Sequence, residues 1–159
     1  MSFDPPIRVL VICWGNSARS IMAEALIRQH GGADFDVNSA GIEPSGVNPL
    51  TERVLDDAGI DHSWARSKSI NEFLDQPFDY VITVCDDSRT VCPVFPGDNQ
   101  TVLHWGYEDP ALAEGTEQQQ LAAFEGTLVM MATRIAHFIS LARRSREQAR
   151  PLESGVASA

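Results

Sequence analysis

The chain has 159 residues, 43% of them apolar, and this size predicts a single domain with one hydrophobic core. Its 12 basic and 22 acidic residues give a formal net charge of −10, which argues against nonspecific binding to nucleic acids or to anionic membranes. Any attraction for an anion must therefore be local. With three cysteines, no leader peptide and no apolar run long enough to span a membrane, we expect a cytoplasmic protein with free thiols.

The apolar pattern predicts strands that alternate with helices. The strands are expected at residues 9–12, 35–39, 80–84 and 101–105. Helices are expected from about residue 21 to 30, over 49–58, over 70–74, and from about residue 117 to 144. This alternation predicts an α/β domain with a doubly wound, four-stranded parallel sheet flanked by helices. We expect the domain to span residues 1–145 and residues 146–159 to form a disordered tail.

The stretch between the first strand and the first helix carries the strongest functional pattern. Cys13 ends the strand, and Arg19 lies six positions later, where the helix opens. Between them, Gly15 lets the backbone approach a ligand closely, and Asn16 tolerates the left-handed conformation that a loop around an anion needs.

Backbone N–H groups, the positive end of the helix dipole and Arg19 together predict a binding site for a tetrahedral oxyanion. The same field predicts that Cys13 is a thiolate. The alternative is a buried core thiol and an arginine that only caps the helix. The expected oxyanion-binding residues are Trp14, Gly15, Asn16, Ser17, Ala18, Arg19 and Ser20.

The segment Cys13-x-Gly15-Asn16-x-x-Arg19-Ser20 resembles the phosphate-binding loop of the low-molecular-weight protein tyrosine phosphatases and of their relatives, the thioredoxin-coupled arsenate reductases. Val84-Cys85 and Cys92-Pro93 resemble the second and third cysteines of the arsenate reductases. Ala18 differs, because many relatives carry a further cysteine there. The resemblance implies a phosphatase-I-like fold and reduction of arsenate to arsenite, with thioredoxin as the source of electrons and no bound cofactor.

A second set of residues resembles the support behind that loop. Asn16, Glu24 and Ser39 are similar to three residues that hold a potassium ion in some arsenate reductases, where an aspartate completes the set. Lys68 stands at the place of that aspartate. Because an ammonium group there could pair with Glu24 in place of the cation, we expect no metal. No histidine-cysteine spacing predicts zinc, and His104 is expected to be a packed residue.

Cys85 and Cys92 supply the two thiols that a reductase needs and a phosphatase does not. Cys85 ends a predicted parallel strand, so it should share an edge of the sheet with Cys13. If the segment to Cys92 were a straight helix, the two Cα atoms would lie about 10 Å apart, beyond the roughly 7 Å limit for a disulfide. We therefore expect this segment to fold back during turnover. The alternative is that both are inert, partly buried thiols.

Asp109-Pro110 resembles the pair that supplies the general acid in this superfamily. Asp109 could instead be a turn residue, and Glu108 is a competing carboxylate. In the phosphatases an aromatic residue commonly follows the pair and lines the tyrosine pocket. Here Ala111 follows, which disfavours a tyrosine phosphatase.

These residues predict an arsenate reductase in which Cys13, Arg19 and Asp109 perform the first step and Cys85 and Cys92 receive the oxidation. Phosphate and sulfate are expected to compete with arsenate, and weak phosphatase activity is expected beside reduction. The alternatives are a phosphatase that needs only the first three residues, and a noncatalytic oxyanion or redox sensor. The sequence leaves open whether thioredoxin or a low-molecular-weight thiol is the reductant, and it does not predict the oligomeric state.

Overall fold

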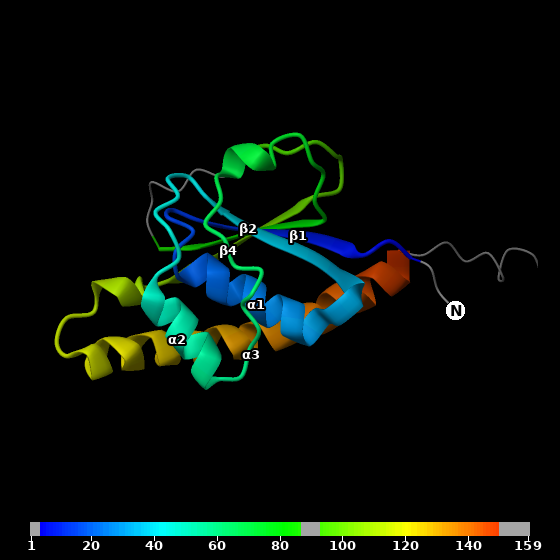
Figure 1. Cartoon of the computed structure of the whole chain (residues 1–159). Helices are drawn as coiled ribbons and strands as arrows, with labels where there is room; N and C mark the ends of the chain where they lie inside the picture. The colour runs from blue at the N-terminus through cyan, green and yellow to red at the C-terminus, as the bar shows by residue number, and fades with distance from the viewer. Residues whose placement is uncertain (1–3, 87–92, 150–159) are drawn as a thin grey trace, which may run out of the picture.

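A computed structural model describes residues 4–86 and 93–149 and shows a sheet flanked by helices (Figure 1). The elements are β1 (Ile7–Cys13), α1 (Arg19–Gly31), η1 (Gly32–Asp34), β2 (Phe35–Gly41), α2 (Pro49–Asp57), η2 (Ile70–Glu72), β3 (Tyr80–Cys85), β4 (Thr101–Tyr107), η3 (Pro110–Leu112) and α3 (Glu117–Ala149), where η denotes a 3₁₀-helix. Each expected strand is present, and each is longer than the apolar run that predicted it.

The sheet is parallel throughout and has the strand order β2-β1-β3-β4. The expected four-stranded parallel sheet is therefore confirmed. β1 lies between β2 and β3, with Cys13 opposite Gly41 of β2 and Ile12 opposite Thr83 of β3. The pairing of β3 with β4 shifts register between Thr83 and Cys85. This topology brings the carboxyl ends of the first and third strands to the same edge of the sheet.

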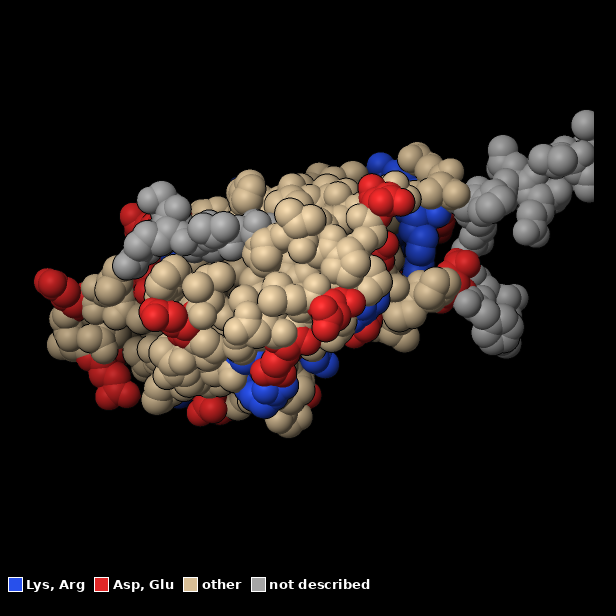
Figure 2. Space-filling model, turned by 90° about the horizontal axis from the view of Figure 1, so that it is seen from above, with Lys and Arg blue, Asp and Glu red and all other residues tan. Residues whose placement is uncertain are grey.

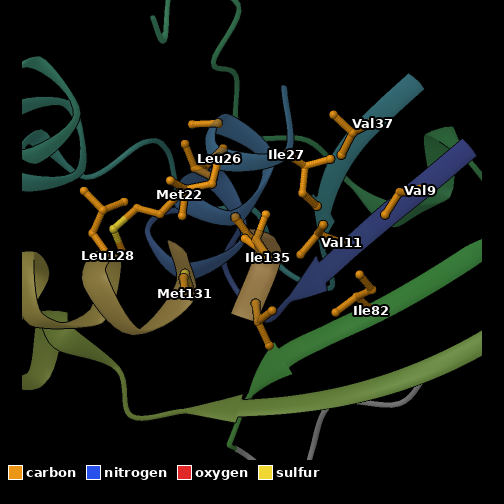
Figure 3. Close-up of a cluster of buried hydrophobic side chains, with 14 of the residues drawn as sticks. Val9, Val11, Met22, Leu26, Ile27, Val37, Ile82, Leu128, Met131 and Ile135 are labelled. Carbon is orange, nitrogen blue, oxygen red and sulfur yellow. The ribbon is translucent and has the colours of Figure 1, made fainter. Parts of the chain in front are cut away.

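Alternate residues of β1 enter two different hydrophobic clusters, because successive side chains of a strand point to opposite faces. Val9 and Val11 pack on one face against α1 and α3, and Figure 3 shows Ile135 of α3 within that cluster. The other face, with Leu10 and Ile12, is covered by a smaller cluster around η2 and the neighbouring loops. Both faces of the sheet are thus buried, as the apolar strands require.

The last helix extends further than the sequence pattern predicted. The expected buried stripe is confirmed at Phe124, Leu128, Met131, Ile135, Phe138, Ile139 and Ala142. The helix continues beyond Arg144 to Ala149, because Arg143 and Arg146 both pair with Asp34, at 2.9 and 3.4 Å. Residues 146–149 are therefore part of α3. Residues 150–159 lie outside the described residues.

Two shorter helices begin where the sequence predicts them. Asn48 caps α2 by accepting a hydrogen bond from the backbone N–H of Leu50, and Pro49 is the first helical residue, as expected. The short helix expected at 70–74 is the 3₁₀-helix η2, which ends at Glu72. Over residues 4–86 and 93–149, no helix combines the length and the apolar character needed to cross a membrane.

The packing of α3 gives a direct test of where the core lies. Ile135 is fully buried, so Ile135→Ala should lower the free energy of unfolding by about 2–5 kcal/mol through lost burial and a cavity. Leu141 on the same helix is 48% exposed, and Leu141→Ala should cost less than about 1 kcal/mol. Urea denaturation of both variants measures the difference. Equal losses would contradict this description of the core.

Candidate active site

The loop between β1 and α1 is held from behind by one buried asparagine. Asn16 is fully buried and has a φ of 46°, the left-handed conformation expected for it. Its amide nitrogen donates to the hydroxyls of Ser20 and Ser39, at 2.8 and 2.9 Å, and its oxygen accepts from the backbone N–H of Lys68 at 2.7 Å. These contacts fix the backbone of the loop before any ligand binds.

The start of α1 is open to an anion. Ala18 is the N-cap residue and forms no side-chain capping hydrogen bond, so no side chain competes for the first N–H groups of the helix. Arg19 opens the helix, two residues before the start that the apolar pattern predicted. Gly41 makes room for the loop, since a Cβ there would lie 2.7 Å from the carbonyl oxygen of Trp14. The sequence analysis gave Gly41 no role.

The guanidinium of Arg19 lies inside the molecule and contacts three chain segments. It donates to the carbonyl oxygen of Tyr107 at 2.9 Å and to Oδ1 of Asp86 at 3.3 Å, and Nη2 lies 3.5 Å from Oδ2 of Asp109. Nε is buried without a hydrogen-bond partner, which suits an oxyanion as acceptor. Burial lowers the pKa of Arg19, but the nearby thiols and carboxyls raise it overall, so the group stays charged.

Cys13 and Cys85 lie together at the carboxyl edge of the sheet, as the parallel topology predicted. The Sγ atoms of Cys13 and Cys85 lie 2.7 Å apart, within hydrogen-bond distance, and the backbone N–H of Trp14 donates to the Sγ of Cys85 at 2.9 Å. Both cysteines are buried. Cys92 lies outside the described residues.

The contact between the two thiols affects the pKa of Cys13. The hydrogen bond with Cys85 and burial raise the pKa of Cys13 well above its ordinary value, and the positive charge of Arg19 and the N–H of Trp14 only partly oppose this. The direction of this shift favours the protonated form of Cys13 in this arrangement of the site, and the expectation of a thiolate stays a prediction. Cys13 must lose its proton before it can act as a nucleophile.

A cavity of about 330 Å³ lies between the loop that follows Cys13, the carboxylates of Asp86 and Asp109, and η3. Its lining includes Cys13, Arg19, Asp86, Asp109, Ala111 and Leu112. Asp109 caps η3 by accepting from the N–H of Ala111 at 3.0 Å and also faces Arg19, so it is both a turn residue and a cavity residue. Glu108 is exposed and does not line this cavity.

Asp86 is the charged cavity residue that the sequence analysis missed. Asp86 directly follows Cys85 at the end of a predicted strand, and this position could have indicated that it lies near the site. The molecule as a whole is acidic, and Asp and Glu side chains are spread around the face shown in Figure 2. The positive charge for an anion therefore comes from Arg19 inside the cavity.

Behind the loop, Glu24 is fully buried and pairs with two cations. It accepts from the hydroxyl of Ser39 at 2.6 Å and from Nε of Arg28 at 2.8 Å. Nζ of Lys68 lies 3.7 Å from its Oε1 and donates to the carbonyl oxygen of Arg66 at 3.0 Å. Burial lowers the pKa of Lys68, and the charge of Glu24 opposes this. Arg28 was not expected here, although its position four residues after Glu24 on the helix could have indicated it.

Other possible metal ligands do not gather near the cavity. In the parts of the chain that the structure describes, no group of three or more His, Cys, Asp or Glu residues could hold a metal ion. His104 is exposed on β4, where its Nδ1 lies 2.6 Å from the hydroxyl of Thr83. The expectation that His104 is packed is thus wrong, because β4 is the edge strand of the sheet.

The thiol contact makes a prediction about pH. Cys85→Ala removes the largest cause that raises the pKa of Cys13, so Cys13 should ionise at lower pH. Because alkylation requires the thiolate, the pH of half-maximal reaction at Cys13 should fall by about one unit or more. Iodoacetamide labelling across pH, read by mass spectrometry of the Cys13 peptide, measures this. An unchanged or higher midpoint would show that Cys85 does not control the proton.

Comparisons with known proteins agree with this geometry. The family model described as low molecular weight phosphotyrosine protein phosphatase matches residues 8–147. An arsenate reductase from Halalkalibacterium halodurans is 41% identical over 130 residues, which make up 82% of this chain and 93% of that protein.

Two solved structures share the fold. A thioredoxin-dependent arsenate reductase from Corynebacterium glutamicum has a TM-score of 0.61 and 29% identity, over 84% of this chain and 64% of that one. A low molecular weight protein tyrosine phosphatase from T. tengcongensis has a TM-score of 0.66 and 26% identity, over 84% of this chain and 98% of that one. With its phosphate-binding type of loop, its parallel sheet and these matches, the chain belongs to the low molecular weight phosphotyrosine protein phosphatase family.

Proposed function

We propose that this chain is an arsenate reductase that passes the oxidation through Cys13, Cys85 and Cys92, with thioredoxin as the reductant. The observation that carries the proposal is the contact of the Cys13 and Cys85 sulfurs, 2.7 Å apart, beside the charged Arg19. A phosphatase has no need of a second thiol against its nucleophile. The named activities of the relatives from Halalkalibacterium halodurans and Corynebacterium glutamicum support the same choice.

The first step is substitution at arsenic. Arsenate enters the cavity and accepts hydrogen bonds from Arg19 and from backbone N–H groups of residues 14–20, which stabilise its negative charge. Cys13 loses its proton, a loss that the charge of Arg19 favours, and its sulfur attacks arsenic. Asp109 donates a proton to the departing oxygen, which leaves as water. The product is an arsenate bound through sulfur to Cys13.

The second step reduces arsenic. The thiolate of Cys85 attacks the sulfur of Cys13, the sulfur–sulfur bond forms, and the electron pair of the sulfur–arsenic bond goes to arsenic, which leaves as arsenite. Cys92 then attacks Cys85, and Cys13 departs as a thiolate. Thiol exchange with thioredoxin returns Cys85 and Cys92 to the reduced state. The competing reductant is a low-molecular-weight thiol, and phosphate and sulfate compete for the oxyanion site.

A phosphatase is the second candidate, because Cys13, Arg19 and Asp109 line one cavity and could transfer a phosphoryl group without further thiols. Ala111 argues against phosphotyrosine as its substrate. It lines the cavity with a methyl group and supplies no aromatic surface for a tyrosine ring. Weak activity toward small aryl phosphates is compatible with either function.

The relay predicts a defined defect for Cys92→Ser. Arsenite release needs only Cys13 and Cys85, so the variant should release about one arsenite per chain and then stop, since exchange requires a resolving thiol. Arsenite formed per enzyme, with thioredoxin and its reductase present, is the measurement, and wild-type protein under the same conditions is the control. Continued turnover by the variant would contradict the relay.

The support behind the loop predicts how the rate responds to ions. We propose that the ammonium of Lys68 takes the place of a bound cation beside Glu24, so the arsenate reduction rate should be the same in potassium and in sodium at fixed ionic strength. Lys68→Met leaves an apolar side chain there, and its rate should fall and rise again with potassium. Lys68→Arg keeps the charge and should remain indifferent to the ion. A several-fold increase of the wild-type rate in potassium would refute this role.

A further inference from the structure

Asp86 and Asp109 place two carboxylates against the same guanidinium inside the candidate cavity. Oδ1 of Asp86 lies 3.3 Å from Nη1 of Arg19, and Oδ2 of Asp109 lies 3.5 Å from Nη2. The two aspartates differ in their surroundings, because Asp109 also caps η3 whereas the side chain of Asp86 is 52% exposed. Among the described residues, the carboxylate of Asp86 contacts Arg19 alone in the cavity. The carboxylate of Asp86 is therefore held by fewer contacts than that of Asp109.

A carboxylate at this position has a definite electrostatic effect on ligand binding. Arg19 is the cationic side chain among the residues that line the cavity, so an entering oxyanion and Asp86 compete for the same positive charge. The oxyanion must displace Asp86 or bind beside a like charge, and either event weakens its binding.

The position of Arg19 does not depend on Asp86. The hydrogen bond from Nη1 to the carbonyl oxygen of Tyr107 is shorter than the contact with Asp86, at 2.9 Å, and it joins Arg19 to the carboxyl end of β4. Asp109 faces the other terminal nitrogen. Removing the charge of Asp86 therefore leaves the guanidinium held in place and frees one of its nitrogens for a ligand.

We infer that Asp86 is an internal counter-ion that occupies Arg19 in the empty site and sets the affinity for tetrahedral oxyanions. This rests on the proposed function only in that Arg19 and the Cys13 loop hold the oxyanion. Asp86 and Asp109 then have separate roles at one guanidinium. Asp86 determines how tightly the anion binds, and Asp109 supplies the proton of the chemical step.

The test uses inorganic phosphate as the probe and Asp86→Asn as the variant, which keeps the shape of the side chain and removes its charge. Isothermal titration should give a dissociation constant for phosphate about three- to fivefold lower than that of the wild type, the range expected for a half-exposed ion pair. In arsenate reduction, the KM of the variant should fall by a similar factor. Asp86→Glu should return both constants toward the wild-type values.

Glu125→Gln is the matched control, since it changes the net charge equally at an exposed position on α3. If it tightens phosphate binding as much as Asp86→Asn does, the effect is one of net charge and the inference is overturned. Phosphate binding by the wild type without any gain in Asp86→Asn overturns this inference alone. Loss of phosphate binding in Arg19→Lys supports the proposed site, whereas failure of the wild type to bind phosphate overturns that site and this inference together.

Discussion

The proposed chemistry depends on the contact between two sulfurs that the chain separates by 72 positions. Cys13 and Cys85 meet because β1 and β3 are parallel neighbours, so their carboxyl ends reach the same edge of the sheet. In the proposed relay this contact gives the nucleophile its redox partner, and it also raises the pKa of that nucleophile. The proposed transfer of oxidation therefore requires that the proton of Cys13 be removed when the substrate arrives.

The second constraint is how an acidic molecule attracts an anion. The chain carries a net charge of −10, and the cavity contains two carboxylates, so the attraction depends on Arg19 and on oriented backbone N–H groups. Burial would destabilise a charged Arg19 if it had no partners. Tyr107, Asp86 and Asp109 supply those partners in the empty site. Further back, Asn16 and Glu24 hold the loop through buried hydrogen bonds, so the N–H groups are oriented before binding.

Local patterns in the sequence predicted the features that depend on neighbouring residues, such as strands, a helix start and a turn. Apolar runs located the four strands, Asn48-Pro49 located the start of α2, and the Gly-Asn pair indicated a left-handed turn at Asn16. Features set by distant contacts were missed. Asp86 and Tyr107 reach Arg19 from 67 and 88 positions away, and the thiol contact that raises the pKa of Cys13 joins residues 72 positions apart. The end of α3 forms ion pairs with Asp34, more than 100 positions earlier. The apolar periodicity of a helix carries no information about such distant partners.

Thiol counting after a single addition of arsenate tests the central claim most directly. Fully reduced wild-type protein is mixed with excess arsenate in the absence of any reductant, and free thiols, arsenite and disulfide-linked peptides are then measured. The account predicts the loss of two thiols and the release of one arsenite per chain, with Cys85 joined to Cys92 and Cys13 free. Three remaining thiols and no arsenite would contradict it and leave a phosphatase. Loss of thiols without arsenite would instead indicate a sensor.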